Sequence, residues 1–135
     1  MKSLTWILGL LMAVAVIFFG LQVVASESGE VVVLYTDDNG EEAATRLWVV
    51  DHDGHQWLRA GGGTATGWYA RVVAQPQVEV ERDGVRRSYL ADSEPVESAR
   101  INELMHDKYG WRDDVVSLLV GSRDDAMAIR LTPLD

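Results

Sequence analysis

The hydrophobic residues of this 135-residue chain begin with one unbroken run, from Trp6 to Val24, in which Gln22 is the single strongly polar side chain. At about 1.5 Å per residue, a helix of this length crosses the roughly 30 Å hydrocarbon core of a bilayer. We therefore expect residues 1–26 to form a transmembrane anchor. A signal peptide, cleaved or uncleaved, is the alternative, because Val23-Val24-Ala25 offers the small residues of a cleavage site.

The pattern changes after the anchor, and residues 27–135 alternate short apolar runs with turn signals over a length that suits one small domain. Apolar and β-branched runs predict six strands, at residues 31–35, 46–50, 55–59, 78–81, 85–90 and 127–131. Asp53-Gly54 and Asp83-Gly84 predict tight hairpins, because both residues of such turns need positive φ. Residues 67–74, 93–109 and 113–120 carry helical signals.

Strands joined mainly by hairpins, with helices inserted between them, indicate an antiparallel α+β domain. A short sheet of six strands hides its edges best by curling into a closed or half-closed barrel. Residues 47–50 place apolar groups on both faces of their strand, so a helix or a second subunit should cover the outer one. We therefore predict a six-stranded split barrel with three helices, preceded by the anchor, and a homodimer as one arrangement.

Charge and composition narrow the function. All 21 acidic residues but only 11 of the 12 basic ones lie from Glu27 onward, which gives this part a net charge of −10. Such a surface repels phosphate backbones, so we expect no nucleic-acid partner. The chain has no cysteine, which excludes disulfides and a thiolate nucleophile. Lys2 before the apolar run favours a single-pass protein with an extracytoplasmic domain.

A glycine-rich stretch is the candidate ligand site. Gly61-Gly62-Gly63 leaves a predicted strand, Trp68-Tyr69 opens the following helix, and Ala74-Gln75-Pro76 with Val78-Glu79-Val80 begins the next strand. Glycines let the backbone approach a ligand closely, and the two aromatic rings supply flat faces beside it. The alternative is a strand-to-helix turn whose aromatic residues belong to the core.

This block and the predicted strand order resemble the split β-barrel flavin and deazaflavin binders related to pyridoxamine phosphate oxidase, and among them the nitroreductase-like, deazaflavin-dependent oxidoreductases. The resemblance covers nearly all of residues 27–135. In that family the double glycine follows the third strand and the Trp-Tyr pair opens the short helix. The resemblance implies a deazaflavin or FMN as cofactor, held at a dimer interface or against the barrel wall.

The resemblance also implies roles for individual residues. The backbone of Gly61, Gly62 and Gly63 would contact the phosphate-bearing chain of the cofactor, and Trp68 and Tyr69 would line the pocket. Arg46, which opens the second strand, would face the phosphate, and Arg71 stands where the family carries Asn. The cofactor does the hydride chemistry, so no catalytic residue of the protein is assigned.

One segment departs from the family. Where relatives carry a basic loop before the second strand, this chain has the acidic residues 37–42. Arg46, Arg59 and Arg71 could restore a positive patch, the cofactor could differ, or the site could be a structural relic. Residues 51–55 hold two histidines at a hairpin turn, but exposed turn residues are usually just solvated, so no metal site is assigned.

Two functions follow. The first is a membrane-anchored oxidoreductase that passes hydride between a deazaflavin or FMN and a small oxidised substrate, such as a quinone or a nitro compound. The alternative is a non-catalytic anchored domain that binds a small molecule or a protein partner.

Overall fold

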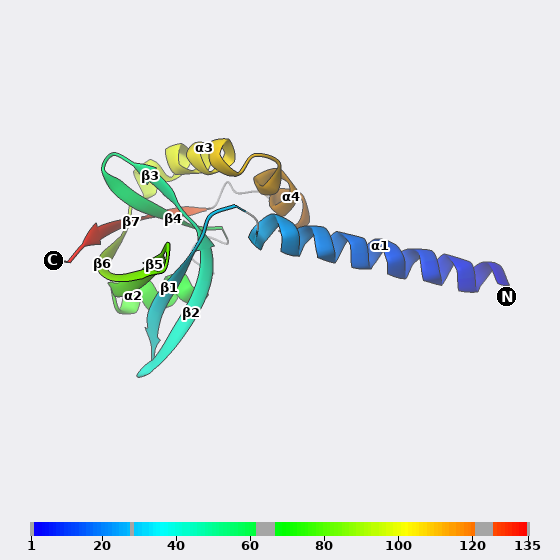
Figure 1. Cartoon of the computed structure of the whole chain (residues 1–135), viewed down its shortest axis with the longest axis horizontal. Helices are drawn as coiled ribbons and strands as arrows, with labels where there is room; N and C mark the ends of the chain where they lie inside the picture. The colour runs from blue at the N-terminus through cyan, green and yellow to red at the C-terminus, as the bar shows by residue number, and fades with distance from the viewer. Residues whose placement is uncertain (1, 28, 62–66, 121–125, 135) are drawn as a thin grey trace.

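The computed structural model describes residues 2–27, 29–61, 67–120 and 126–134. Its first element is the helix α1 (Lys2–Glu27), which projects from the domain as a single rod (Figure 1). Among the described residues, α1 is the one helix that is long and apolar enough to cross a membrane, and its apolar part, Lys2–Gly20, is not buried against the domain. The same length and composition also suit a signal sequence.

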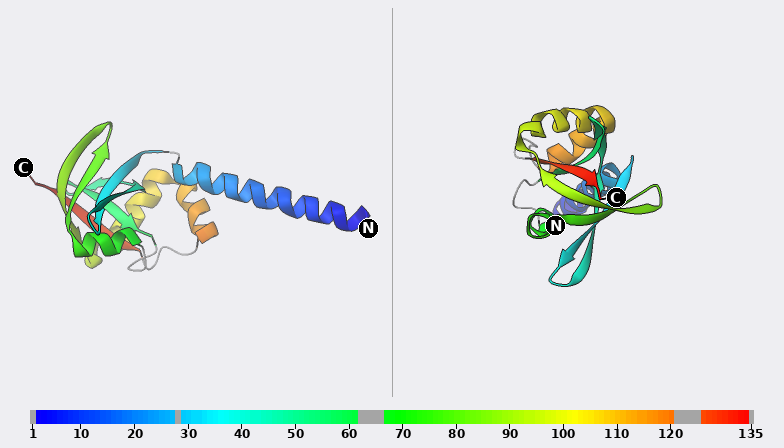
Figure 2. Two further views of the ribbon diagram at one scale, coloured as in Figure 1. Left: turned by 90° about the horizontal axis from the view of Figure 1, so that it is seen from below. Right: turned by 90° about the vertical axis from the view of Figure 1, so that its left-hand side faces the viewer.

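The domain is a curled antiparallel sheet with helices at its open sides (Figures 1 and 2). Its strands are β1 (Val31–Asp38), β2 (Glu41–Trp48), β3 (Val50–His52), β4 (His55–Ala60), β5 (Gln77–Arg82), β6 (Val85–Ser93) and β7 (Met127–Pro133). Its helices are α2 (Gly67–Ala74), the short 3-10 helix η2 (Pro95–Glu97), α3 (Ser98–Tyr109) and α4 (Trp111–Val120). The strands follow the order β2-β1-β5-β6-β7-β4-β3.

Three tight turns fix the register of the hairpins. The turns are Asn39-Gly40, Asp53-Gly54 and Asp83-Gly84, and every one of these six residues has positive φ. Two consecutive residues with positive φ make the turn type whose twist matches that of paired strands. The hairpins predicted at Asp53-Gly54 and Asp83-Gly84 are therefore confirmed, and they join β3 to β4 and β5 to β6.

The predicted count of six strands and three helices is wrong, because the described residues form seven strands and four α-helices, α1 included. The extra strand arises where residues 46–50 were expected to form one strand. Here β2 ends at Trp48 after pairing with β1, and β3 begins at Val50 and pairs with β4. Since β2 and β3 are the two edges of the sheet, Val49 alone carries the chain from one edge to the other.

The predicted helix over residues 93–109 also begins later than expected. β6 continues to Ser93, where it pairs with Ile129 of β7, and Pro95 starts η2 before α3 takes over at Ser98. Pairing across the sheet therefore extends the strand into a segment whose local signals favour a helix.

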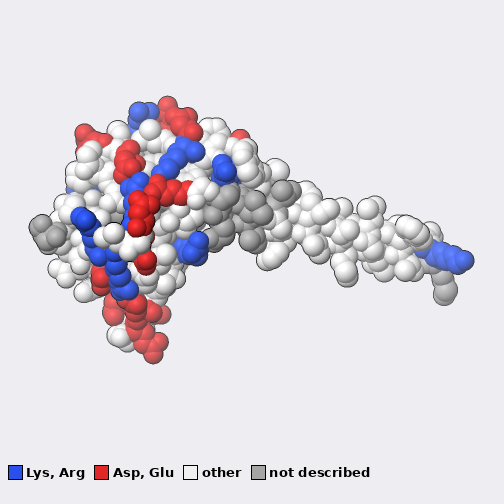
Figure 3. All heavy atoms as spheres, in the orientation of Figure 1, with Lys and Arg blue, Asp and Glu red and all other residues white. Residues whose placement is uncertain are grey.

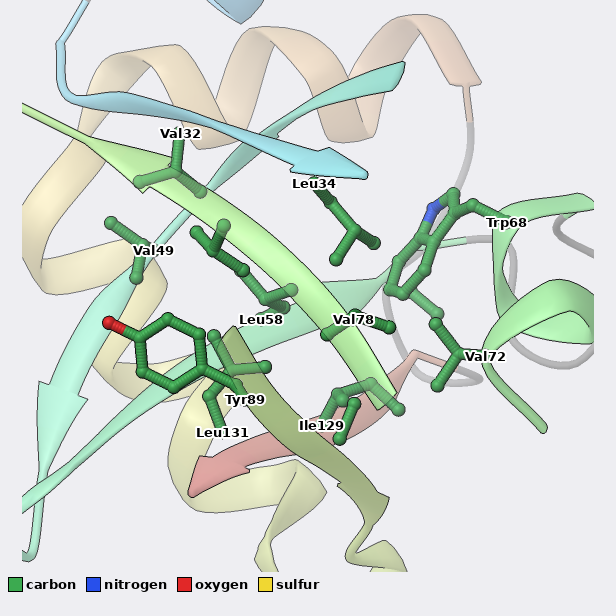
Figure 4. Close-up of a cluster of buried hydrophobic side chains, with 13 residues drawn as sticks. Val32, Leu34, Val49, Leu58, Trp68, Val72, Val78, Tyr89, Ile129 and Leu131 are labelled. Carbon is green, nitrogen blue, oxygen red and sulfur yellow. The ribbon is translucent and has the colours of Figure 1, made fainter. Parts of the chain in front are cut away.

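Two groups of apolar side chains form the core. The larger group fills the inside of the curled sheet, where Trp68 and Val72 of α2 lie beside Leu34 and Val78 (Figure 4). The smaller group lies between α3 and strands β3, β4 and β7, and consists of Val50, Trp57, Ile101, Met105, Tyr109 and Ala128. The helices α2 and α3 therefore cover two different parts of the sheet and hold it curled.

The crossing at Val49 is secured by side chains of α3. Val49 is fully buried, and its N–H donates a hydrogen bond to the Tyr109 hydroxyl over 3.0 Å. Its carbonyl oxygen accepts from Nζ of Lys108 at 2.7 Å. The Tyr109 hydroxyl donates in turn to the carbonyl oxygen of Glu30 at 2.6 Å. Burial raises the pKa of Tyr109 to about 12, so the hydroxyl keeps its proton for this bond.

The segment between α1 and β1 is held by an ion-pair network around Glu30. Arg82 donates to both carboxylate oxygens of Glu30 at 2.8 and 2.9 Å and to both of Asp51 at the same distances. Lys108 adds a second cation, 2.6 Å from Glu30. The hydrogen bond from Arg82, aided by Lys108 and opposed by partial burial, lowers the pKa of Glu30 from 4.5 to about 2. This network joins β3, β5 and α3 to the residues that follow α1.

Replacing Tyr109 with Phe should destabilise the domain, because the buried N–H of Val49 loses its acceptor while the ring still stacks on Trp48. A buried donor without a partner costs about 1–3 kcal/mol. The free energy of unfolding of the full chain in detergent, from denaturant titration, measures the loss. Tyr35→Phe is the matched control, since the Tyr35 hydroxyl bonds the partly exposed Glu81. Equal losses in the two variants would contradict the role given to Tyr109.

Replacing Glu30 with Gln should lower the melting temperature at neutral pH by removing the charge that Arg82 and Lys108 bind. A carboxylate whose pKa is lowered in the folded state stabilises that state above its unfolded pKa, and this contribution disappears as the pH falls to the folded pKa. The gap between wild type and Glu30→Gln should thus be full above pH 4.5 and close towards about pH 2. Asp51, whose pKa Arg82 also lowers, should add to the acid sensitivity of the wild type.

The control for this series is Glu103→Gln, which removes an exposed i,i+3 partner of Arg100 on α3. Exposed pairs of this kind contribute at most about 1 kcal/mol, so this variant should follow the wild type. A gap for Glu30→Gln that stays constant from neutral pH to pH 2 would show that the carboxylate charge is not its source.

Candidate functional site

The predicted ligand site surrounds the start of α2. Gly61 directly follows β4 and is half-buried, while Gly62 and Gly63 lie outside the described residues. Helix α2 begins at Gly67 and ends at Ala74, where Pro76 prevents a further turn. The chain thus leaves β4, passes through the glycine-rich segment and returns to the barrel through α2.

The two aromatic residues of α2 have different surroundings. Trp68 is buried in the larger core group, and its ring points into the barrel beside Leu34 (Figure 4). Tyr69 is half-buried, packs against the same group, and its hydroxyl shares a hydrogen bond of 3.0 Å with Ser93 Oγ. The geometry therefore makes Trp68 a core residue, while Tyr69 links α2 to the end of β6.

Arg71 points from α2 towards the first hairpin. Its Nε donates to Thr36 Oγ1 at 2.8 Å, and its Nη2 donates to Thr45 Oγ1 at 3.4 Å. Its Nη1 lies 3.6 Å from where a side chain on Gly67 would begin, so the guanidinium reaches back to the first residue of α2. Within the described residues it pairs with no carboxylate. Arg71 therefore brings a positive charge, held by neutral hydroxyls, to the point where the glycine-rich segment enters the helix.

Two threonines belong to this site although the sequence did not predict them. Thr36 and Thr45 lie on neighbouring strands, at inward positions that place them opposite α2. Thr36 is almost fully buried. Nothing in the local sequence marks either residue, and only the register of β1 against β2 shows that both face Arg71.

Arg46 does not join this group within one chain. It follows Thr45 on β2, and successive strand residues point to opposite faces of a sheet. Since Thr45 faces Arg71, Arg46 faces outward, and it is exposed. Arg46, which the family resemblance assigns to the phosphate, and Arg71, which could add to a positive patch, therefore lie on opposite sides of β2.

An open groove of about 420 Å³ begins at Thr36 and runs between the first hairpin and the start of β5. Its charged lining consists of Asp37, Glu42 and Glu79. Figure 3 shows acidic side chains gathered at the tip of the β1–β2 hairpin, where the sequence has four carboxylates in residues 37–42. This groove suits neutral or cationic groups better than phosphate.

Arg86 neutralises part of the groove. It binds Glu42 and, at 2.9 Å, Glu79, and its guanidinium lies 3.6 Å above the centre of the Tyr35 ring. Glu42 first and Glu79 second raise the pKa of Arg86. The hydrogen bond that the Tyr35 hydroxyl donates to Glu81 raises the pKa of Tyr35. The pair with Glu79 crosses from β6 to β5, and Arg86 is thus committed to carboxylates.

The histidine hairpin carries no metal-like cluster. In the described part of the chain, no group of three or more His, Asp and Glu side chains converges on one point. Asp51 is paired with Arg82, and His55 Nδ1 lies 3.1 Å from the carbonyl oxygen of Asp53. His52 lies 3.8 Å from Glu97. These side chains support the turn and its neighbours separately.

Solved structures share this fold at low sequence identity. A protein assigned as a pyridoxamine 5′-phosphate oxidase from Listeria innocua is 15% identical, with a TM-score of 0.59 over 88% of this chain and 94% of its own. An F420-H2 dependent reductase, FDR-A, is 20% identical, with a TM-score of 0.58 over 75% and 93%. A protein solved as a domain-swapped dimer is also 20% identical, with a TM-score of 0.57 over 75% and 79%.

These likenesses confirm the split-barrel fold that the glycine and Trp-Tyr block suggests. No curated protein matches the sequence at a significant level. A family model described as an uncharacterized protein conserved in bacteria (DUF2255) matches residues 21–131, which include all of the barrel except the end of β7. The chain therefore belongs to this bacterial family and has the fold of the pyridoxamine phosphate oxidase-like split barrels.

Proposed function

We propose that this protein is a membrane-anchored, oxidoreductase-like split-barrel protein that binds FMN or a deazaflavin. It would pass hydride between that cofactor and a small oxidised substrate such as a quinone or a nitro compound. The observation that carries the proposal is the guanidinium of Arg71, which is held by two threonine hydroxyls and reaches back to the first residue of α2. The fold shared with an F420-H2 dependent reductase supports the same class of cofactor.

The residues around Arg71 fit the phosphate-bearing part of such a cofactor. A guanidinium bound only to hydroxyls among the described residues can still pair with an anion, and arginine does so with two parallel hydrogen bonds. Thr36 and Thr45 fix its position without cancelling its charge. Arg71 would hold the phosphate, and the backbone at Gly61 would allow the chain to approach it closely.

The remaining candidates take different parts in this proposal. Gly62 and Gly63 would extend the backbone contact begun at Gly61. Tyr69 would border the pocket, while Trp68 would support it from inside the core. A bound flavin or deazaflavin would supply the hydride chemistry itself, and the protein would bind, orient and shield it.

The anchor and the dimer complete the proposal. A single-pass helix would keep the domain at the bilayer surface, where lipophilic quinones are concentrated. Arg46 faces out from β2, so it would reach a cofactor only if that cofactor lay between two copies of the chain. The similarity to a protein solved as a domain-swapped dimer is in keeping with a homodimer.

The acidic groove favours a second candidate function. Three carboxylates line this groove, and the charge of Arg86 is taken up by two of them. Like charges a few ångströms apart oppose the binding of a polyanionic cofactor tail. In this alternative the barrel is a non-catalytic anchored domain, and the groove binds a neutral or cationic small molecule or a protein partner.

Cofactor titration of the full chain in lipid nanodiscs distinguishes the two functions. FMN and a deazaflavin coenzyme are added separately, and fluorescence reports binding. Arg71→Gln removes the charge but keeps a hydrogen-bond donor for Thr36, so the fold should persist. Losing one charge-assisted hydrogen bond costs about 1.5–3 kcal/mol, and we expect the dissociation constant to rise about 10–150-fold.

Arg100→Gln is the matched control, because Arg100 is an exposed arginine of α3 that pairs with Glu103 on the same helix. It should bind the cofactor as the wild type does. Arg46→Gln reports the assembly: weaker binding in this variant supports a site between two copies, and unchanged binding supports a site within one chain. A folded wild type that takes up neither cofactor would refute the oxidoreductase proposal and leave the binding domain.

A further inference from the structure

The helix α4 has a second apolar face that the domain does not cover. Its inner side carries Asp113 and Val116, which are both buried. Asp113 forms an ion pair of 2.7 Å with Arg59, which is itself buried, and this pair fixes α4 against the barrel. The outer side carries Trp111 and Leu118, whose exposed fractions are 50% and 79%.

The exposed residues form one stripe along the helix. Trp111, Val115 and Leu118 follow the spacing i, i+4 and i+7, which places them on a single face. Val115 is half-buried between the other two. A ten-residue helix with one face tied to its domain and an apolar stripe on the opposite face needs a second apolar environment.

The position of α4 indicates which environment this is. Helix α4 contacts α1, and in both Figures 1 and 2 it lies beside the domain end of α1, on the side towards which α1 projects. At about 1.5 Å per residue, the 26 residues of α1 extend about 39 Å, whereas the hydrocarbon core is only about 30 Å thick. The last turns of α1 therefore reach the headgroup region, and α4 lies at the same level.

We propose that α4 is a second membrane contact, which lies in the bilayer interface beside α1 with Trp111, Val115 and Leu118 turned towards the lipid. The inference rests on the membrane anchoring in the proposed function. Tryptophan favours this interface because its ring is apolar and its N–H is polar. The guanidinium of Arg112 stands 5.0 Å from the Trp111 ring, at the level of the lipid phosphates.

The charges near the α4 stripe indicate which kind of lipid surface this helix can contact. Asp114 flanks the stripe with its side chain exposed, and His106 lies 3.4 Å from it. Together with the net charge of −10 from Glu27 onward, this disfavours strongly anionic membranes. The contact is thus an apolar one, and zwitterionic phosphatidylcholine is the appropriate probe.

Spin labelling tests the inference directly, since the chain has no native cysteine. The full chain is reconstituted in phosphatidylcholine nanodiscs, and a nitroxide is attached to Leu118→Cys. Its collision rates are measured with oxygen, which concentrates in lipid, and with a water-soluble nickel complex. Val14→Cys in the middle of α1 and Val96→Cys, whose native residue is 91% exposed on η2, are the lipid and water references.

We expect the label at 118 to give an oxygen-to-nickel collision ratio between those at 14 and 96, and several-fold above that at 96. The depth derived from this ratio should be about 5–10 Å, as for helices that lie in the interface. A label on Trp111→Cys should give the same depth, which tests a second position of the stripe. All labelled variants should melt with the wild type, because each replaced side chain is exposed by at least 41%.

The other outcomes separate the inference from the function on which it rests. Lipid contact at 14 with water contact at 118 would overturn the role of α4 and leave the anchor standing. A label at 118 that meets neither oxygen nor nickel would also overturn it, because protein rather than lipid would cover the stripe. Water contact at 14, or a mature chain that begins after α1, would overturn both the anchor and the role of α4. Cofactor uptake is measured separately and is unaffected by any of these results.

Discussion

The hydrogen bonds of Val49 are the constraint on which the rest of the structure depends. The sheet order begins with β2 and ends with β3, and these two edges are consecutive in the chain. One buried residue must therefore turn from one edge to the other without a strand partner for its N–H and carbonyl groups. An unpaired backbone group in the core costs about as much as a lost hydrogen bond. Tyr109 and Lys108 of α3 supply the missing partners, so the barrel closes only when α3 is in place.

The same side chains connect the Val49 crossing to the segment that follows α1. Tyr109 binds the carbonyl oxygen of Glu30 and Lys108 binds its carboxylate, while Arg82 joins that carboxylate to Asp51. The residues that follow α1 are thus held by the same cluster that closes the barrel. In the proposed anchored protein, a domain attached in this way would keep a fixed orientation to α1. The proposed membrane contact of α4 requires this fixed orientation, because a freely rotating domain would not hold one helix at the bilayer surface.

Sequence reasoning predicts local features well in this chain and long-range ones poorly. The Asp-Gly turns were predictable because their backbone geometry excludes most other residues. The apolar helix α1 was predictable from the length of its hydrophobic run, and the end of helix α2 was predictable from Pro76. The break at Val49 was not, because residues 47–50 form a continuous apolar run and the turn depends on Tyr109, 60 residues away in the sequence. The start of β2 at Glu41 was missed for a related reason, since pairing with β1 outweighs the low strand propensity of acidic residues.

The candidate site shows the same limit for individual arginines. Composition gives this domain a large negative charge but does not say which cations are already paired. Arg59, Arg82 and Arg86 each bind one or more carboxylates, whereas the described partners of Arg71 are the hydroxyls of Thr36 and Thr45. Hydroxyls orient a guanidinium without neutralising it, so Arg71 retains its full attraction for an anion. The net charge of the domain repels anions in general. A cation that no carboxylate neutralises therefore provides one specific point at which an anion can bind. The pairing of Arg59, Arg82 and Arg86 with carboxylates, rather than the overall charge of the domain, therefore distinguishes Arg71 from these three arginines.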